Sequence, residues 1–226
     1  MKHITYILLT ILLLTGCQQE ELLNNTGFGV LSIGSIQVAD SRTQQITTKA
    51  VETDLYVEIW KDGGLFANNK FNPGQVPSSI DLPAGSYQLV SYNQAYLEQE
   101  TWTNEQMGAP AYYKKSEPFV VQTGEVNHQT LEVPMVNVGV RLDANLPAEF
   151  TDYKLSVKVG NRQVVLTPDQ SAYFPIVAGD NQIVYTLRAK NADQEERFST
   201  SDPVSPVAGT VYTLSYQLEE LEVTEK

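Results

Sequence analysis

The sequence is poor in the residues that carry metal and nucleophilic chemistry. Its 226 residues include one cysteine, Cys17, and two histidines, His3 and His128. A single cysteine cannot form a disulfide within the chain, so stability has to come from a packed core, and about 200 residues are enough for one large domain or two small ones. A multi-histidine zinc site is excluded, and little is left for a catalytic triad. We therefore expect no metal, no cofactor and no catalytic residue, with His128 facing solvent on a polar strand.

Positive charge is also scarce. The chain has 15 lysines and arginines against 27 aspartates and glutamates, which gives a formal net charge of −12 at pH 7. Nucleic acids and anionic membrane surfaces are bound through clusters of positive charge, and the sequence has no such cluster. We therefore exclude nucleic acid as a partner.

Long apolar runs are missing as well. The longest mostly apolar stretch is residues 4–14, whereas a membrane-spanning helix needs about 20 apolar residues. Lys2 precedes this stretch, and LTGC at residues 14–17 follows it, which resembles a secretory signal peptide that ends in a bacterial lipobox. We expect residues 1–16 to be removed and the sulfur of Cys17 to carry the lipid that anchors the protein to the outer membrane. A catalytic or buried Cys17 is disfavoured because the residues after it are polar.

A polar tether is expected over residues 17–26. Its QQEE stretch, residues 18–21, resembles the short acidic export signals of surface lipoproteins from some Gram-negative anaerobes. The same four residues are equally typical of a solvated linker, so the cell-surface side of the membrane is expected but both interpretations stay open.

Alternation of apolar and polar residues predicts β-strands along most of the remaining chain. Residues 54–60 place Leu55, Val57 and Ile59 on one face, and residues 153–159 alternate in the same way. Further strands are expected at residues 28–38, 86–92, 117–122, 126–143, 171–177, 182–190 and 210–218. Short strands separated by glycine, proline, asparagine and aspartate are typical of antiparallel β-sandwiches, so we predict an all-β fold.

A short phrase with Ala-Gly at a turn before a tyrosine-containing strand occurs three times, in LPAGSYQL, IVAGDNQIVYTL and PVAGTVYTL. Glycine tolerates the positive φ that such turns require. The repetition suggests two modules of similar construction, at residues 27–134 and 135–220, with a tail at residues 221–226. The boundary is soft because residues 126–143 could form one long strand that is kinked at Pro134.

Several of these segments together resemble the fimbrillin-like surface lipoproteins, and within that group an uncharacterised lipoprotein domain family of Gram-negative anaerobes. They are the lipobox, GVLSIGSIQV, TKA before an alternating strand, LPAGSYQLVSYN, APAYYKKSEPFVV, MVNVGVRL and TDYKLSVKVG. The resemblance implies a pair of transthyretin-like β-sandwiches, an outer-membrane or cell-surface location, and a role in adhesion, pilus assembly or carbohydrate-related surface systems. It implies no catalytic residue.

The long connection at residues 93–113 is the strongest candidate for ligand binding, because long loops in compact domains are often functional. Flat aromatic rings beside amide side chains suit a sugar or a protein partner. Alternatively, Tyr96, Leu97 and Trp102 cap the edge of the sandwich through a short helix, and Tyr112 and Tyr113 open the next strand. We favour this alternative for the two neighbouring tyrosines, and both interpretations stay open for Trp102. Trp60, on the outward face of its strand, is a further candidate that could equally pack on the sheet. The candidate residues are Tyr96, Trp102, Tyr112, Tyr113 and Trp60.

Arg42 is a candidate processing site in a polar loop after the first expected strand. Fimbrillin-type pilins are cut after an arginine at a comparable place, which frees a groove for a strand from the next subunit. Exposed arginines in polar loops are ordinary, however, and Lys49 is nearby. Cleavage and self-assembly are therefore the second hypothesis.

The sequence as a whole favours a non-enzymatic lipoprotein on the surface that acts as a binding, adhesion or assembly component. Its partners would be the membrane, through the lipid anchor, and glycans or surface proteins. A carbohydrate-active enzyme is a distant third possibility, since Asp143 with Glu149 or Asp152 could be imagined as glycosidase carboxylates. Chance pairs are expected among 27 acidic residues.

Overall fold

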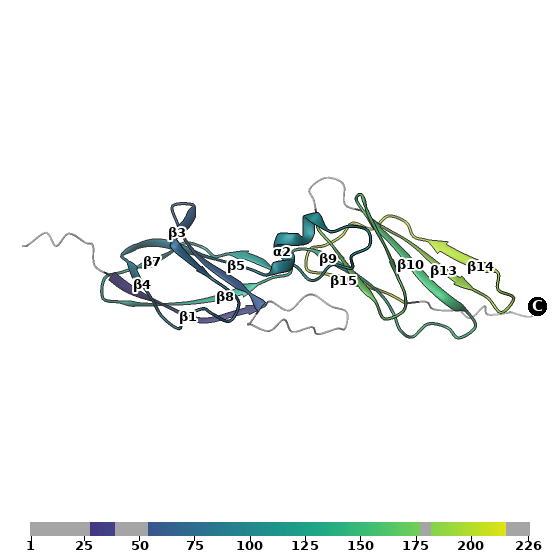
Figure 1. The fold of residues 1–226 in the computed structure, drawn as a ribbon, viewed down its shortest axis with the longest axis horizontal. Coiled ribbons are helices and arrows are strands. Elements are labelled where there is room, and N and C mark those ends of the chain that lie inside the picture. The colour runs from purple at the N-terminus through teal and green to yellow at the C-terminus, as the bar shows by residue number, and fades with distance from the viewer. Residues whose placement is uncertain (1–27, 39–53, 177–181, 216–226) are drawn as a thin grey trace, which may run out of the picture.

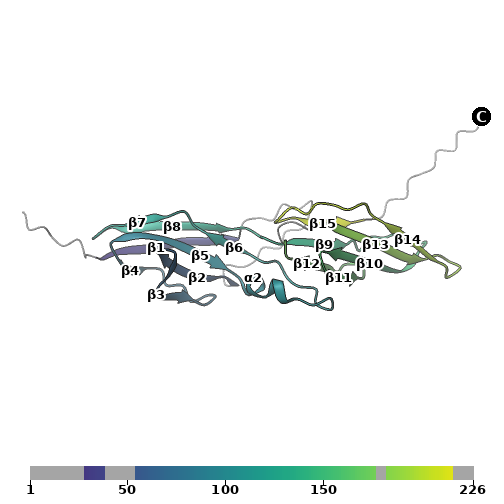
Figure 2. The same ribbon diagram turned by 90° about the horizontal axis from the view of Figure 1, so that it is seen from above.

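The protein is an elongated all-β molecule in which two β-sandwiches lie end to end (Figure 1). The computed structural model describes residues 28–38, 54–176 and 182–215. The first sandwich contains β1 (Phe28–Val38), β2 (Tyr56–Lys61), β3 (Gly64–Phe71), β4 (Ile80–Pro83), β5 (Gly85–Tyr92), β6 (Tyr113–Lys115), β7 (Phe119–Val121) and β8 (Val126–Val133). Helix α2 (Gln94–Glu98) and the 3-10 helix η2 (Gln99–Thr101) follow β5, and α2 lies at the junction of the sandwiches in both views (Figure 2).

The second sandwich repeats the topology of the first except for β7, which pairs with β5 and has no counterpart among the described strands of the second. It contains β9 (Val138–Leu142), β10 (Thr151–Val159), β11 (Arg162–Leu166), β12 (Ser171–Phe174), β13 (Ile183–Lys190), β14 (Glu196–Thr200) and β15 (Val211–Leu214). Sheet order β4-β1-β8 in the first sandwich corresponds to β12-β9-β15 in the second, and β3-β2-β5-β6 corresponds to β11-β10-β13-β14. The same strand order in both halves means that both bury their apolar faces in the same way.

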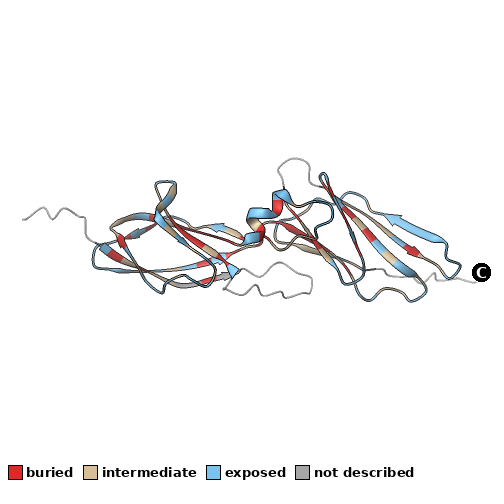
Figure 3. Cartoon of the chain, in the orientation of Figure 1, coloured by how far each residue is buried: buried red, intermediate tan, exposed pale blue. Residues whose placement is uncertain are grey.

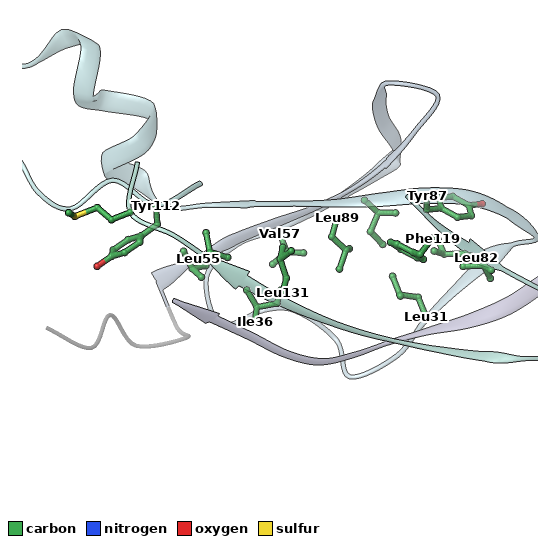
Figure 4. Packing of buried hydrophobic residues seen from close by; sticks show 14 residues of the cluster. Leu31, Ile36, Leu55, Val57, Leu82, Tyr87, Leu89, Tyr112, Phe119 and Leu131 are labelled. Atoms are coloured by element: carbon green, nitrogen blue, oxygen red, sulfur yellow. The ribbon is translucent and has the colours of Figure 1, made fainter. Parts of the chain in front are cut away.

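Each sandwich has its own hydrophobic core, and buried residues follow the middle of each (Figure 3). Leu55, Val57 and Ile59 of the first core are at most 2% exposed, as their alternation predicts, and Figure 4 shows the side chains that surround Leu55 and Val57. Each fully buried side chain of this size contributes roughly 1.5–3 kcal/mol to stability. The all-β sandwich class that the alternation predicts is therefore confirmed.

Two strand pairs depart from the antiparallel pattern that the sequence suggests. β1 pairs with β8 in parallel, and β9 pairs with β15 in parallel. In each sandwich the first strand thus lies beside the last one. Alternation along a strand reports which side chains are buried but not which strand is its neighbour, so the parallel pairs could not be foreseen.

Several strands were not predicted from the sequence, and one predicted strand is divided in the structure. β14 has every residue exposed, so it shows no apolar alternation, and β3 is interrupted by Ala67 and Asn68, which have positive φ. β4 and β11 were also missed, and both are short. The expected long strand at residues 126–143 is divided into β8 and β9 by residues 134–137. Pro134 has no N–H and cannot donate a backbone hydrogen bond to a neighbouring strand.

Some sequence predictions lie outside the described residues. They are the signal peptide at residues 1–16, the tether at residues 17–26 with Cys17, the candidate cleavage site Arg42 and the tail at residues 221–226. Within the part of the chain that is described, no helix has the length and apolar character needed to cross a membrane.

Candidate binding surface

The outer face of sheet β3-β2-β5-β6 carries a cluster of aromatic and charged side chains. Tyr56, Glu58 and Trp60 alternate with the core residues of β2 and therefore point away from the core. Strand pairing places Tyr92 of β5 beside Tyr56, and Tyr113 of β6 beside Tyr92. We call this cluster the aromatic face; its members are Tyr56, Glu58, Trp60, Lys70, Tyr92, Tyr96, Tyr113 and Lys115.

Glu58 is the hydrogen-bonding centre of the aromatic face, and it is only 8% exposed. Its Oε1 accepts a hydrogen bond of 2.5 Å from the hydroxyl of Tyr92, and its Oε2 accepts one of 2.8 Å from Nε1 of Trp60. Nζ of Lys70 lies 3.2 Å from Oε1. Burial raises the pKa of Glu58, but the hydrogen bonds from Tyr92, Trp60 and Lys70 outweigh burial, and the pKa lies below its ordinary value. The carboxylate is therefore held ionised in a nearly buried position.

The tyrosine rings of this face pack against one another. Tyr56 and Tyr92 are stacked with centroids 5.4 Å apart, and Tyr96 and Tyr113 are stacked at 4.5 Å. Tyr96 comes from α2, whose N-cap Asn93 accepts hydrogen bonds from the backbone N–H groups of Tyr96 and Tyr112. Asn93 thus fixes α2 beside the sheet, and α2 adds the ring of Tyr96 to the aromatic face.

Two lysines lie over these rings. Nζ of Lys70 is 5.7 Å from the ring centroid of Tyr56 and 5.6 Å from that of Tyr92, and Nζ of Lys115 is 4.7 Å from the ring of Trp60. Such contacts contribute roughly 0.5–1 kcal/mol at exposed sites. The aromatic face therefore presents partly exposed rings together with positive charge on an otherwise acidic protein.

The structure brings together three of the five aromatic residues that the sequence proposed for binding. Trp60, Tyr96 and Tyr113 are partly exposed on the aromatic face. Tyr112 is only 4% exposed, belongs to the first core and directly precedes β6. Its side chain is therefore part of the core packing and is not placed to contact a ligand.

Trp102 lies elsewhere, in a segment that joins the two sandwiches. We call residues 99–110 the strap, because they leave the first sandwich and lie against β11 and β12 of the second. Arg162 of β11, 9% exposed, has its Cζ 5.5 Å from the centroid of the Trp102 ring. The long connection singled out in the sequence is thus largely a junction between the sandwiches.

Arg162 holds the strap by several contacts at once. Its Nε donates a hydrogen bond of 3.0 Å to the carbonyl of Thr103, and its other two nitrogens donate to the carbonyls of Gln106 and Tyr173. The backbone N–H of Tyr173 in turn donates to the carbonyl of Met107 at 2.8 Å. Burial lowers the pKa of Arg162, and backbone carbonyls, not a carboxylate, receive its hydrogen bonds.

Asn137 fixes the end of the strap from inside the junction. The residue is fully buried; its Oδ1 accepts a hydrogen bond from the N–H of Ala111, and its Nδ2 donates to the carbonyl of Ala109. The carbonyl of Asn137 accepts from the N–H of Gly209, just before β15. A buried amide that satisfies its neighbours in this way is costly to replace.

Asp152, one of the acidic residues considered as glycosidase groups, is engaged in ion pairs. Asp152 forms ion pairs with Lys190 at 3.2 Å and Lys154 at 3.7 Å, and hydrogen bonding to Lys190, followed by the charges of Lys154 and Lys190, lowers its pKa. A general acid needs a raised pKa, so Asp152 does not fit that role. No group of three potential metal ligands occurs in the part of the chain that is described.

Sequence reasoning missed Tyr56, Glu58, Tyr92, Lys70 and Lys115 as members of the aromatic face. Tyr56 and Glu58 share the outward phase of Trp60, which was a usable signal. The other members come from strands whose pairing with β2 is not readable from local periodicity. Arg162 was missed for the same reason.

A family model described as domain of unknown function DUF4493 matches residues 27–226. The chain belongs to this family. Among solved structures, a proposed cell adhesion protein from Bacteroides uniformis ATCC 8492 resembles this DUF4493 member with a TM-score of 0.50 and 12% identity, over 84% of this chain and 93% of that one. The two therefore share a fold. No curated protein sequence matches.

Two further structures resemble the DUF4493 chain more loosely. A proposed adhesin from Bacteroides ovatus ATCC 8483 has a TM-score of 0.40 and 12% identity, over 92% of this chain and 99% of that one. A fimbrilin from Porphyromonas gingivalis W83 also has a TM-score of 0.40 and 12% identity, over 75% of this chain and 72% of that one.

Proposed function

We propose that this protein is a non-enzymatic, surface-anchored lipoprotein that acts as a binding or adhesion component, with the aromatic face as its contact surface. The observation that supports this proposal is the gathering of partly exposed rings and lysines on one sheet face. Aromatic side chains combine apolar contact area with polar groups, which is why they are common in binding surfaces. Cell adhesion, the role in the description of the Bacteroides uniformis protein of similar fold, is the role proposed here.

The anchor in this proposal is a lipid on Cys17, which would hold the protein on the outer membrane, on its cell-surface side. Two or three acyl chains give stable anchoring because each buried CH₂ contributes roughly 0.8 kcal/mol. A test is metabolic labelling with an alkyne fatty acid of cells that express the wild-type chain or Cys17→Ala. Label on both proteins would contradict the anchor.

The binding role is tested with fluorescently labelled protein from residue 17 onward, added to intact bacterial and epithelial cells. The double variant Trp60→Ala with Tyr113→Ala should lose most of the cell binding, because both side chains belong to the aromatic face. The matched control is Thr130→Ala, an exposed residue of β8 on the other sheet of the same sandwich. Equal cell binding by the wild type, the double variant and the control would contradict the proposal.

A pilus subunit that is cut after Arg42 and then polymerises is the second candidate, and the position of β1 favours it. β1 is the middle strand of its sheet, with β4 on one side and β8 on the other. Leu31 and Ile36 of β1 are 0% and 8% exposed and belong to the first core. A cut after Arg42 would disconnect β1 from the rest of the chain, and a strand from another subunit could then take its place.

Intact mass spectrometry of the protein from its native membrane distinguishes the two candidates. A chain that begins at acylated Cys17 with every later residue present would rule out the processed pilin. A chain that begins at Thr43 without lipid, in polymers that resist denaturant, would replace the binding-protein proposal by the pilus one.

We also propose that residues 27–134 and 135–220 are domains. The separate cores support this division, although Tyr173 and Val211 of the second sandwich also pack against the first core. Each piece would be expressed alone and examined by thermal unfolding. A cooperative transition for each would support the division, and two unfolded pieces would contradict it.

A further inference from the structure

We infer that the aromatic face binds a glycan that carries carboxylate groups, such as a chain containing uronic acid. This inference rests on the proposed function, because it names the ligand class for the same surface. It is carried by the distribution of charge in the first sandwich and by the pairing of Lys115 with Trp60.

Among the described residues of the first sandwich, positive charge is confined to one of the two sheets. The lysines of strands β1 to β8 are Lys61 in β2, Lys70 in β3, and Lys114 and Lys115 in β6. All of these strands belong to sheet β3-β2-β5-β6, and sheet β4-β1-β8 contains no lysine or arginine. Lys61 lies over Phe66 and Tyr87, next to the core, whereas Lys70 and Lys115 lie over the rings of the aromatic face. In a chain of net charge −12, the aromatic face is therefore a part of the sandwich that is suited to an anion.

Lys115 is the lysine of the aromatic face whose charge is available to a ligand. Nζ of Lys70 is neutralised by Glu58 at 3.2 Å. Among the described residues, by contrast, no carboxylate lies within ion-pair distance of Lys115, and its ammonium lies over the ring of Trp60 at 4.7 Å. A carboxylate that approaches this corner of the face would meet an ammonium without an anionic partner.

Trp60 supplies the second part of the site. The hydrogen bond from its Nε1 to Glu58 fixes the orientation of the indole, so its ring does not have to be ordered on binding. Lys115 has a flexible side chain, and its contact with the ring contributes only roughly 0.5–1 kcal/mol. When Lys115 turns to a carboxylate, the ring is uncovered, and the apolar face of the same sugar residue can pack on it.

The shape of the surface favours a glycan over an acidic peptide. Peptides usually add a strand at a sheet edge or insert side chains into a groove, whereas the aromatic face lies across the outside of four paired strands. A hollow of about 460 Å³ lies away from it, beside the strap, lined by residues such as Asn104, Met107 and Val165. A partly exposed indole beside a lysine suits a pyranose that carries a carboxylate.

The experiment is a calorimetric titration of the chain from residue 17 onward with oligogalacturonate. Matched probes are a neutral galactan oligosaccharide of the same length and poly-glutamate. The variants are Lys115→Gln, Trp60→Ala and the control Lys158→Gln, which removes an equal charge from an exposed position of β10 in the second sandwich. We expect oligogalacturonate to bind, Lys115→Gln and Trp60→Ala to weaken binding about tenfold or more, and Lys158→Gln to leave it unchanged.

Three results would overturn the inference. Equal binding of the neutral oligosaccharide, with no effect of Lys115→Gln, would mean that the charge has no role, although the proposed function would stand. Equal or tighter binding of poly-glutamate would assign the face to acidic peptides. No binding of any probe would reject the glycan, and the proposed function would then depend on the cell-binding assay with its Trp60 and Tyr113 variants.

Discussion

The guanidinium of Arg162 lies over the ring of Trp102, with Cζ 5.5 Å from the ring centroid, and joins the strap to β11. The same side chain donates hydrogen bonds to backbone carbonyls of the strap and of β12. Trp102, which the sequence left open between ligand binding and capping of a sandwich edge, is therefore part of the connection between the two sandwiches.

Arg162→Met should destabilise the protein by about 3 kcal/mol. Methionine keeps the apolar stem but leaves three part-buried carbonyls without this donor, and a buried unsatisfied group costs about 1–3 kcal/mol. Urea unfolding measures the loss, and limited proteolysis should show new cleavage in the strap. Arg197→Met is the control, because its side chain is 63% exposed and pairs only with Glu195. Equal losses for both variants would contradict the role of Arg162.

Gly108→Ala should destabilise the protein by about 1–3 kcal/mol more than Gly74→Ala. Both glycines have a φ of +71°, so the backbone cost of adding a Cβ is the same at both sites. At Gly108 the new Cβ would lie 2.7 Å from the ring of Trp102, whereas nothing lies within 4 Å at Gly74. Overpacking of this kind costs typically 1–3 kcal/mol. Thermal or urea unfolding of the two variants gives the difference directly, and similar losses would mean that Trp102 moves freely.

Glu58→Gln should remove a pH-dependent part of the stability. The pKa of Glu58 is lowered in the folded protein, since hydrogen bonds from Tyr92, Trp60 and Lys70 outweigh burial. The stability that ionised Glu58 contributes is therefore fully present above the ordinary glutamate pKa of about 4.3. It is lost as the pH falls through the lower pKa of Glu58 in the folded protein. Wild type should be more stable than Glu58→Gln at pH 7, and the gap should shrink in acid.

Urea midpoints at pH 7, 5 and 3 measure this gap. The control is Glu132→Gln on β8, where the side chain is exposed. A gap between wild type and Glu58→Gln that is the same at all three pH values would show that Glu58 acts only through packing.

Tyr112→Ala and Tyr113→Ala should differ strongly although the residues are neighbours. Tyr112 is 4% exposed in the first core, and truncation of a large buried aromatic side chain costs about 3–5 kcal/mol. Tyr113 is partly exposed and stacked on Tyr96, so its loss should cost about 1.5 kcal/mol or less. Denaturant unfolding compares the two, and comparable losses would contradict the assignment of only Tyr112 to the core.

The sequence predicted the strands whose burial is a local property. Alternation was enough to place Leu55 and Val57 in the core, and β1 was expected over the residues that it occupies. β14 was not predictable, since its exposed residues carry no apolar pattern.

Of the aromatic face, the sequence predicted Trp60, Tyr96 and Tyr113 as candidates, but not the residues that surround them. Whether an aromatic residue is exposed depends on what covers it. The guanidinium of Arg162 lies over the ring of Trp102, and the ring of Tyr96 stacks on that of Tyr113. These partners are distant in the sequence, and no local periodicity reports them.

The parallel pairing of β1 with β8 affects how the protein can be made. β1 pairs with β8 along most of its length, from Val30 beside Val126 to Val38 beside Val133. The sheet that contains β1 is therefore complete only after β8, the last strand of the sandwich, has been made. Pairing across such a distance makes folding slow. In the proposed export of the chain with its N-terminus first, the apolar side of β1 would be exposed until β8 had followed, and the translocated chain would need protection by a chaperone during that interval.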